Sequence, residues 1–367
     1  MMLSPNNHQI CYSGDINKFR FSFVDLFAGI GGFRRGFEAW GGRCVWTSEI
    51  DRFATETYVA NFNDSHKIWS DIKTADPHYD VPDHDVLLAG FPCQPFSLAG
   101  VSKKNSLGRL HGFLDQVQGT LFFDLARIIA AKQPKAFLLE NVKNLLSHDS
   151  GRTFKTIINV LENELGYEVH HKVINALNWV PQNRQRVYII GFKQKTNFSW
   201  NELQIPTRNP TLKEIIHLPE EKPEAPYTEK NLGFTCVDNR YTLSDRLWNF
   251  LQSHAKKHAA IGNGFGYSLF GPNDIARTLS ARYYKDGSEI LIKQDGGANP
   301  RKLTPRECSR LMGFDTRETP FDKIMKIPVS DTRAYKQFGN SVVVPVIRDI
   351  ARILLSNTNL SPQINRI

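Results

Sequence analysis

Short apolar runs alternate with helix-like segments along the first half of the chain. The apolar runs that predict buried β-strands lie at residues 21–27, 43–49, 85–89, 135–140 and 186–192. Apolar residues at three- and four-residue spacing predict helices after the glycines near residue 31, over 122–129 and over 157–165. Strands that alternate with helices predict an α/β fold, a mostly parallel, doubly wound sheet with helices on both faces.

Residues that begin or end helices sharpen this pattern. Asp51 follows the second strand and is placed to cap the next helix, whereas Pro134 and Gly166 end two others. Near the end of the chain, Pro345 suits the first turn of a closing helix. The expected buried face of that helix, packed back on the first half of the chain, is Ile347, Ile350, Ala351 and Leu354.

The regular alternation is lost after Lys193. Residues 206–226 are rich in proline and charge, further glycines follow, and no clear period returns until about Pro305. We therefore expect residues 1–192 and 331–367 to form a large domain. Residues 193–330 would form a smaller, loop-rich domain and its hinge.

Composition narrows the class of protein only modestly. The formal net charge of +9 favours a polyanionic partner, although many basic surfaces are merely solvated. The five scattered cysteines form no Cys-x-x-Cys pair, which favours a reducing compartment and predicts no metal site. No signal peptide and no apolar run of about 18 residues is present, so we expect a cytoplasmic protein without a membrane span.

A strand that runs into glycines, residues 25–32 (DLFAGIGG), suits the close approach of a nucleotide-like ligand. A dinucleotide fingerprint would place glycine at position 34, where this chain has Arg34. Glu49 ends the second strand and is placed to accept hydrogen bonds from a ribose diol. The plainer alternative is a tight turn and a surface acid.

Three further motifs carry reactive groups. Cys93 follows a strand and lies between Pro92 and Pro95, where a thiolate can attack an electron-poor carbon; the alternative is a buried structural cysteine. Glu140 ends a strand and can donate a proton if burial raises its pKa, or it merely caps a helix. The arginine motif, residues 182–186 (QNRQR), can hold an acid, a phosphate or a base oxygen, or form a solvated strand edge.

Taken together, these motifs resemble the cytosine-5 DNA methyltransferase family. The strings that carry the resemblance occur in the family's order and span nearly the whole chain: DLFAGIGG from 25, GFPCQ from 90, ENV from 140, QNRQR from 182, RKLTPRECSRLMGF from 301 and YKQFGNS from 335. The resemblance implies the class I S-adenosylmethionine-dependent methyltransferase fold with a target-recognition domain.

The resemblance also implies a cofactor, S-adenosyl-L-methionine, which leaves as S-adenosyl-L-homocysteine. Phe27 would pack on its adenine, Glu49 would bind its ribose, and Asn340 with Ser341 would hold the amino-acid end. The full set of implied cofactor contacts is Phe27, Ala28, Gly29, Gly31, Gly32, Glu49, Ile50, Asp71, Ile72, Gly90, Pro92, Leu121, Asn340 and Ser341. Ile50 departs from relatives, in which an aromatic residue often follows the acid.

Catalysis and DNA binding are implied in the same way. Cys93 would add to carbon 6 of a flipped-out cytosine, Glu140 would engage N3, and Arg186 with Arg184 would steady the base and Glu140. The expected contacts to double-stranded DNA are Gln94, Ser97, Lys103, Lys104, Arg109, Arg277, Thr278 and Arg282. Residues 262–288 resemble recognition domains of enzymes that methylate CCNGG or CCWGG sites, and we expect a monomer with or without a cognate restriction endonuclease.

Three alternatives remain at this point. A tRNA-methylating branch of the family shares the catalytic motifs, but it has a smaller region between the arginine motif and residues 304–307. A catalytically silent DNA-binding relative would not need Cys93, Glu140 and Arg186 together. An NAD oxidoreductase is opposed by Arg34 and by the Pro92-Cys93 pair.

Overall fold

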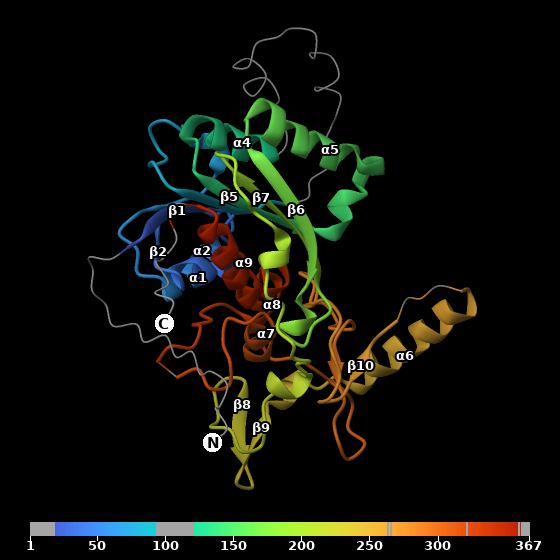
Figure 1. Ribbon diagram of the computed structural model, residues 1–367. Coiled ribbons are helices and arrows are strands. Elements are labelled where there is room, and N and C mark those ends of the chain that lie inside the picture. Colours follow the sequence, from blue (N-terminus) through green and yellow to red (C-terminus); the bar gives the residue numbers. More distant parts are fainter. Residues whose placement is uncertain are drawn as a thin grey trace, which may run out of the picture.

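A twisted seven-stranded sheet forms the centre of the molecule in the computed structural model (Figure 1). The structure describes residues 19–92, 121–262, 264, 266–320, 322–358 and 360. The strands are β1 (Phe21–Leu26), β2 (Gly42–Ser48), β3 (Ile68–Trp69), β4 (Val86–Gly90), β5 (Ala136–Val142), β6 (Glu168–Asn175) and β7 (Gln185–Phe192). Their spatial order is β3-β2-β1-β4-β5-β7-β6, and β7 runs antiparallel to both of its neighbours while the other pairs are parallel. The expected mostly parallel α/β sheet is confirmed.

Helices cover both faces of this sheet. One face carries α1 (Gly32–Glu38), α2 (Arg52–Asn61) and α9 (Val344–Ser356), and the other carries α4 (Leu121–Lys132) and α5 (Arg152–Asn159) (Figure 1). A π-helical turn at Val160–Glu164 extends α5. Along β4, Val86 and Leu88 belong to one apolar layer, and Leu87 and Ala89 belong to the other. This two-sided burial explains why the central strands are continuous apolar runs.

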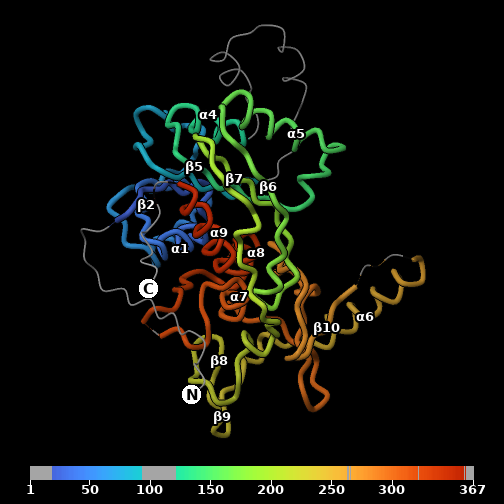
Figure 2. Tube along the Cα trace, in the orientation of Figure 1, coloured from blue at the N-terminus to red at the C-terminus, as the bar shows by residue number. Residues whose placement is uncertain are grey.

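The last helix packs against the first, so the end of the chain returns to the sheet (Figure 2). Pro345 lies in the first turn of α9, as predicted, and the expected face is buried. The contact is close because Gly36 of α1 has no side chain: a Cβ there would lie 2.5 Å from Ile347. The predicted closing helix is confirmed, and so is the prediction that Asp51 caps α2.

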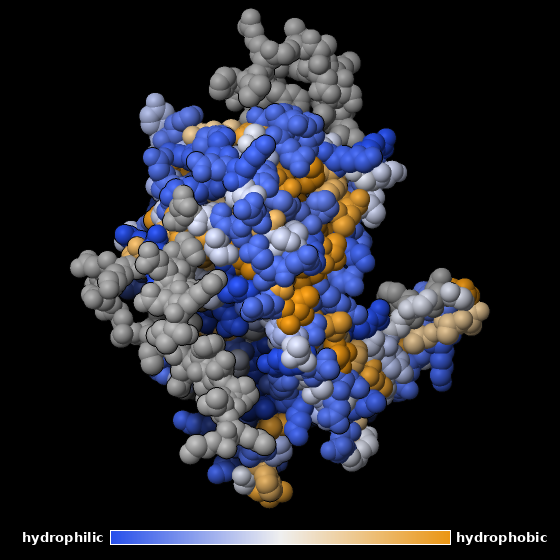
Figure 3. All heavy atoms as spheres, in the orientation of Figure 1, coloured by the Kyte–Doolittle hydropathy of each residue, from blue (hydrophilic) through white to orange (hydrophobic). Residues whose placement is uncertain are grey.

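The region after β7 is built mostly from short elements around an extension of the same core. These are β8 (Thr228–Asn231), β9 (Phe234–Val237), α6 (Asp245–Ala260), β10 (Leu269–Phe270), β11 (Leu291–Ile292), β12 (Arg301–Lys302), α7 (Pro305–Leu311) and α8 (Asp331–Asn340). The β8–β9 hairpin projects from the body, and Leu232 and Phe234 at its tip are exposed, which agrees with the apolar side chains visible there in Figure 3.

Within the described ranges, no helix is both long and apolar enough to cross a membrane. The longest helix among the described residues, α6, was not predicted. Its buried residue Leu251 and the half-buried Leu247 and Trp248 lie in its first half, whereas the second half projects away from the body (Figure 1). After Leu251 the helix contains mainly polar residues and alanine, so no stripe of large apolar residues continues along its second half.

Candidate active site

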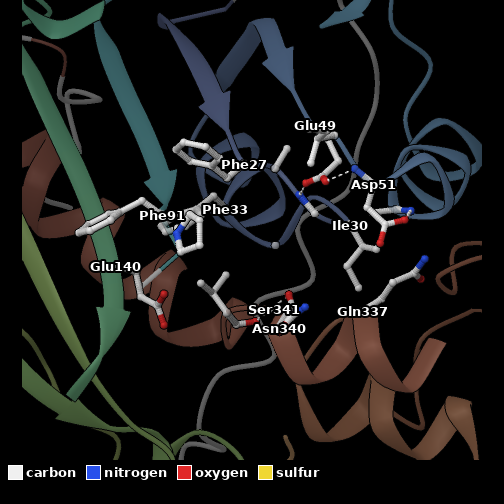
Figure 4. A pocket seen from close by; sticks show the side chains of 18 of the residues that line it. Phe27, Ile30, Phe33, Glu49, Asp51, Phe91, Glu140, Gln337, Asn340 and Ser341 are labelled. Carbon is white, nitrogen blue, oxygen red and sulfur yellow. Dashed lines mark hydrogen bonds between the residues drawn. The ribbon is translucent and has the colours of Figure 1, made fainter. Parts of the chain in front are cut away.

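A cavity of about 570 Å³ opens at the carboxyl ends of β1, β2, β4 and β5. Ligands in open α/β sheets bind at this edge. Segments from the two ends of the chain line the cavity together, as the labelled side chains in Figure 4 show. Glu49 lies at one end of the cavity and Glu140 at the other, with Phe27 and Phe33 between them.

The glycine loop, residues 27–32, forms the floor between β1 and α1. β1 ends at Leu26, one residue earlier than predicted, and Phe27 takes a left-handed conformation with φ of 55°. Such a conformation is uncommon for a bulky side chain and concentrates at functional sites. Gly29 and Gly31 share the left-handed region, with φ of 57° and 83°. The turn leaves the Phe27 ring on the cavity wall.

Glu49 is held by two backbone N–H groups. Gly29 N donates to its Oε2 and Asp51 N donates to its Oε1, both at 2.7 Å. Burial raises the pKa of Glu49, and these two hydrogen bonds oppose that rise because they favour the charged form. Each oxygen keeps a lone pair for a further donor, so the carboxylate can accept hydrogen bonds from vicinal hydroxyl groups in the cavity.

The wall beyond Glu49 is more open. Ile50 lines the cavity with 73% of its surface exposed, and buried Ile72 follows Asp71, which caps a short 3₁₀ turn through Lys73 N. Ile50 therefore offers an apolar but uncovered face to a planar ligand. Leu121, at the start of α4, completes this side.

Helix α8 closes the cavity from the opposite end of the chain. Lys336 Nζ lies 3.1 Å from Asp51 Oδ2, the carboxylate that also caps α2. Gln337 accepts a hydrogen bond from the Thr57 hydroxyl at 3.0 Å and donates to the Phe53 carbonyl at 2.8 Å. Asn340 and Ser341 then bring the end of α8 to the cavity, as Figure 4 shows.

Glu140 occupies the other end of the cavity. Glu140 lies on β5, and its register partner on β4 is Gly90. The carboxyl group therefore lies beside the segment that leads to Pro92. Arg186 Nε lies 3.1 Å from Glu140 Oε1. Burial raises the pKa of Glu140 although Arg186 and Arg184 lower it, so the carboxyl group holds a proton more readily than an exposed glutamate does.

Asn141 fixes the backbone just before the predicted nucleophile. Its side-chain amide donates to the Phe91 carbonyl at 2.9 Å, and both residues are buried. Pro92 is the last described residue of this segment and lines the cavity. The predicted nucleophile and the DNA contacts predicted next to it in the sequence lie outside the described residues: Cys93, Gln94, Ser97, Lys103, Lys104 and Arg109.

Arg184, which the resemblance implies steadies the base, is almost completely buried. Its guanidinium donates to the carbonyls of Leu279, Gly339 and Ser341, at 2.8, 3.0 and 2.7 Å. Burial, together with the charge of Arg186, lowers the pKa of Arg184 to about 9. Its closest bonded partners are thus backbone carbonyls of two distant segments, while its side chain still borders the cavity.

The predicted recognition residues lie next to the arginine motif. Arg277 and Arg282 are exposed, and Arg277 donates to the Ser268 hydroxyl at 3.2 Å. The Thr278 hydroxyl donates to the Asn183 carbonyl at 2.6 Å. The segment that carries these residues is therefore anchored to the motif while its arginines face solvent.

Nearly all of the predicted cofactor residues meet in one cavity. The exception is Gly31 of the glycine loop, which does not line the cavity and packs against the Phe62 ring. The cavity is also lined by residues to which the sequence assigned no contact with a ligand: Ile30, Phe33, Ser48, Asp51, Ala54, Ser70, Phe91, Asn141, Val142, Lys336, Gln337, Gly339 and Val342. Within the described part of the chain, no group of three or more His, Cys, Asp or Glu residues is arranged to hold a metal ion.

A doubly wound sheet with a glycine loop, an anchored acid after β2 and a long cavity at the strand ends is typical of α/β proteins that bind a nucleotide-like ligand. The model of the C-5 cytosine-specific DNA methylase family matches residues 21–356. The chain belongs to this family and is an enzyme.

Similar proteins agree with this assignment. The chain is 48% identical to the Escherichia coli K12 protein named DNA-cytosine methyltransferase, over 92% of this chain and 78% of that protein. It is 50% identical to type II methyltransferase M.SsoII of Shigella sonnei, over 92% of this chain and 80% of that protein. The crystal structure of S. pombe Dnmt2 methyltransferase, at 17% identity, matches with a TM-score of 0.66 over 93% of this chain and all of that one, and it supports the fold.

Proposed function

We propose that this protein transfers a methyl group from S-adenosyl-L-methionine to carbon 5 of cytosine in double-stranded DNA. The observation that carries the proposal is the single cavity that joins the anchored Glu49 to the buried Glu140–Arg186 pair and reaches Pro92, the residue before Cys93. A methyl donor at the first end and a base at the second would share this space.

The residues at the Glu49 end fit the cofactor. The Glu49 carboxylate has free lone pairs for a ribose diol, and the Phe27 ring and Ile72 offer apolar faces for adenine. Asn340 and Ser341 supply polar groups for the amino-acid end. When bound, S-adenosylmethionine supplies a methyl group activated by a positively charged sulfur, and S-adenosylhomocysteine remains as the product.

The Glu140 end supplies the groups that activate cytosine. Carbon 5 is a poor nucleophile while the ring is aromatic. The Cys93 thiolate forms a bond to carbon 6, and the electron pair of the 5,6 double bond moves toward carbon 5. Glu140 donates a proton to N3 and offsets the charge of the adduct, as preorganised donors do. Arg186 holds the Glu140 carboxyl group in place.

Completion of the transfer returns the ring to aromaticity. A donor held by Glu49, Asn340 and Ser341 would supply the methyl group to the carbon 5 electron pair and would keep the electrons of the broken carbon–sulfur bond on its sulfur. N3 returns its proton to Glu140, a base removes the carbon 5 proton, and the bond between Cys93 and carbon 6 breaks to regenerate the thiolate. A base stacked in duplex DNA cannot reach this cavity, so the cytosine flips out at a cost of a few kcal/mol.

We propose that residues 193–330 form the target-recognition domain, and that residues 1–192 with 331–367 form the catalytic domain. The exposed Arg277 and Arg282 can reach guanine edges in the major groove. The resemblance of residues 262–288 to recognition domains of CCNGG or CCWGG enzymes supports a target of that type. Digestion of host DNA with methylation-sensitive nucleases after expression would identify the site, and methylation elsewhere would refute this target.

A trapping experiment tests the covalent mechanism. Duplex DNA that contains 5-fluorocytosine should form a denaturation-resistant adduct with the protein at Cys93, because fluorine cannot leave as a proton does. Cys93→Ala should form no adduct and transfer no methyl group, yet still bind DNA. An active preparation that yields no adduct would rule out the covalent step, and methyl transfer confined to tRNA would rule out the DNA substrate.

A further inference from the structure

Three segments that are far apart in the chain meet behind the cavity. The first is the arginine motif, residues 182–186, and the second is the recognition segment, which we define as residues 277–282. The third is the closing loop, residues 339–342, at the end of α8. The closing loop and the recognition segment are in direct backbone contact: a Cβ at Gly339 would lie 2.3 Å from the Ser280 carbonyl carbon.

Arg184 ties these two segments together. Nη1 donates to Leu279 of the recognition segment at 2.8 Å, whereas Nη2 donates to Gly339 and Ser341 of the closing loop at 3.0 and 2.7 Å. The side chain is almost completely buried, so these bonds form without competition from bulk water. Displacement of either segment would break bonds to one and the same guanidinium.

Two other residues of the motif also form hydrogen bonds to the recognition segment, and one of them bonds to α7 as well. Gln182 accepts a hydrogen bond from Leu279 N at 2.9 Å and donates to the Leu311 carbonyl at 3.3 Å. The Thr278 hydroxyl donates to the Asn183 carbonyl at 2.6 Å. Two residues after Arg184, Arg186 reaches Glu140 in the cavity. The motif therefore contacts all three places where, on the proposed function, DNA, the target base and the cofactor bind.

We propose that Arg184 is a positioning residue that couples target recognition to cofactor binding. On the proposed function, DNA that seats the recognition segment also fixes the Leu279 carbonyl, and through Arg184 it fixes the closing loop against the cofactor. Such coupling is reciprocal: a bound cofactor strengthens DNA binding by the same factor by which DNA strengthens cofactor binding. Non-cognate DNA does not seat the recognition segment and gives no enhancement.

Equilibrium binding of radiolabelled S-adenosylhomocysteine to the full-length protein tests this coupling. The dissociation constant is measured alone, with saturating unmethylated bacterial genomic DNA, and with the same DNA after exhaustive methylation by the protein. For the unaltered protein we expect unmethylated DNA to tighten binding at least fivefold. In Arg184→Lys, which keeps the charge but cannot reach three carbonyls, this ratio should fall to near one. Arg208→Lys, an exposed arginine paired with Glu214, is the matched control and should keep the ratio.

A second variant guards against a folding defect. Thr278→Val leaves Arg184 and its three bonds intact and removes only the hydroxyl bond to Asn183. It should reduce the ratio while thermal unfolding stays close to that of the unaltered protein. If Arg184→Lys keeps the full ratio, or if the unaltered protein has a ratio of one while it methylates DNA, the coupling through Arg184 is refuted and the proposed function stands. A protein that methylates no DNA would instead refute the proposed function.

Discussion

Arg186 reaches Glu140 diagonally across two antiparallel strands. The register partner of Glu140 on β7 is Tyr188, yet Arg186 Nε lies 3.1 Å from Glu140 Oε1. The two side chains are only 14% and 11% exposed, so this pair is shielded from water and from salt. The arrangement orients one carboxyl oxygen toward Arg186 and leaves the other for a ligand in the cavity.

Substitution of Glu140 by Gln should slow methyl transfer by a factor of about 10²–10⁴, the usual contribution of a positioned proton donor. The amide keeps the shape of the side chain but cannot release a proton to the base. Single-turnover rates measure this effect, and binding of S-adenosylhomocysteine should be nearly unchanged. A Gln variant with an unchanged single-turnover rate would exclude proton donation by Glu140.

The pH dependence of the same step provides a separate check. Burial raises the pKa of Glu140, so the protonated form persists to higher pH than for an exposed glutamate. The single-turnover rate should therefore fall as pH rises through that raised pKa, and this descending limb should be absent in Glu140→Gln. An identical descending limb in both proteins would assign it to another group.

Substitution of Glu49 by Ala should weaken cofactor binding about tenfold or more, because a hydrogen bond to a charged group contributes about 1.5–3 kcal/mol. In the unaltered protein Gly29 N and Asp51 N donate to the Glu49 carboxylate, and the variant leaves both N–H groups without this acceptor. Titration with S-adenosylhomocysteine measures the loss, and the exposed Glu56→Ala on α2 is the control. Equal affinities in the two variants would show that Glu49 does not contact the ligand.

The glycine loop and the acid after β2 were predictable because local rules determine them. A strand followed by glycines must turn at the carboxyl end of the sheet, and Asp51 directly precedes the helix that it caps. Glu49 then lies at the same edge because β1 and β2 pair in parallel. The order of strands in the sheet turns these local features into one cavity.

The contacts of α8 with α2 and its cap were not predictable, because the partners lie far apart in the sequence. The Lys336–Asp51 ion pair joins residues 285 positions apart, and no local sequence pattern predicts it. The strand β6 was missed for another reason: it is a half-exposed edge strand, so its apolar alternation is weak. The burial of Arg184 against three carbonyls likewise depends on tertiary packing alone.

Substitution of Gly31 by Ala should lower the free energy of unfolding by about 1–3 kcal/mol. It should also weaken cofactor binding. Gly31 has φ of 83°, and its added Cβ would lie 2.2 Å from the Phe62 ring, so the glycine loop must shift. Gly166→Ala is a matched control, since Gly166 has φ of 72° but no atom within 4 Å of the added Cβ. Chemical denaturation should show a larger loss at Gly31, and equal losses would leave backbone strain as the sole cause.

The buried Glu307 should make the stability of the protein depend on pH below neutrality. Arg301 holds its carboxylate through two hydrogen bonds of 2.8 Å, and the N–H groups of His217 and Thr304 donate to it at the same distance. Burial alone would raise the pKa of Glu307, but these partners outweigh burial and lower it to about 2. Because the folded-state pKa is depressed, the stabilisation is fully present above the pKa of the unfolded chain. It is lost as pH falls toward 2, and it amounts to about 3 kcal/mol.

Urea unfolding at several pH values between 7 and 3 checks this contribution. Glu307→Gln should lower the free energy of unfolding at pH 7 by about 3–5 kcal/mol, because it leaves the buried Arg301 without its charged partner. Its stability should also change less between pH 5 and pH 3 than that of the unaltered protein, since the titrating group is gone. The exposed Glu162→Gln should behave like the unaltered protein at every pH. Parallel pH profiles for Glu307→Gln and the unaltered protein would mean that Glu307 is not the group whose protonation unfolds the molecule.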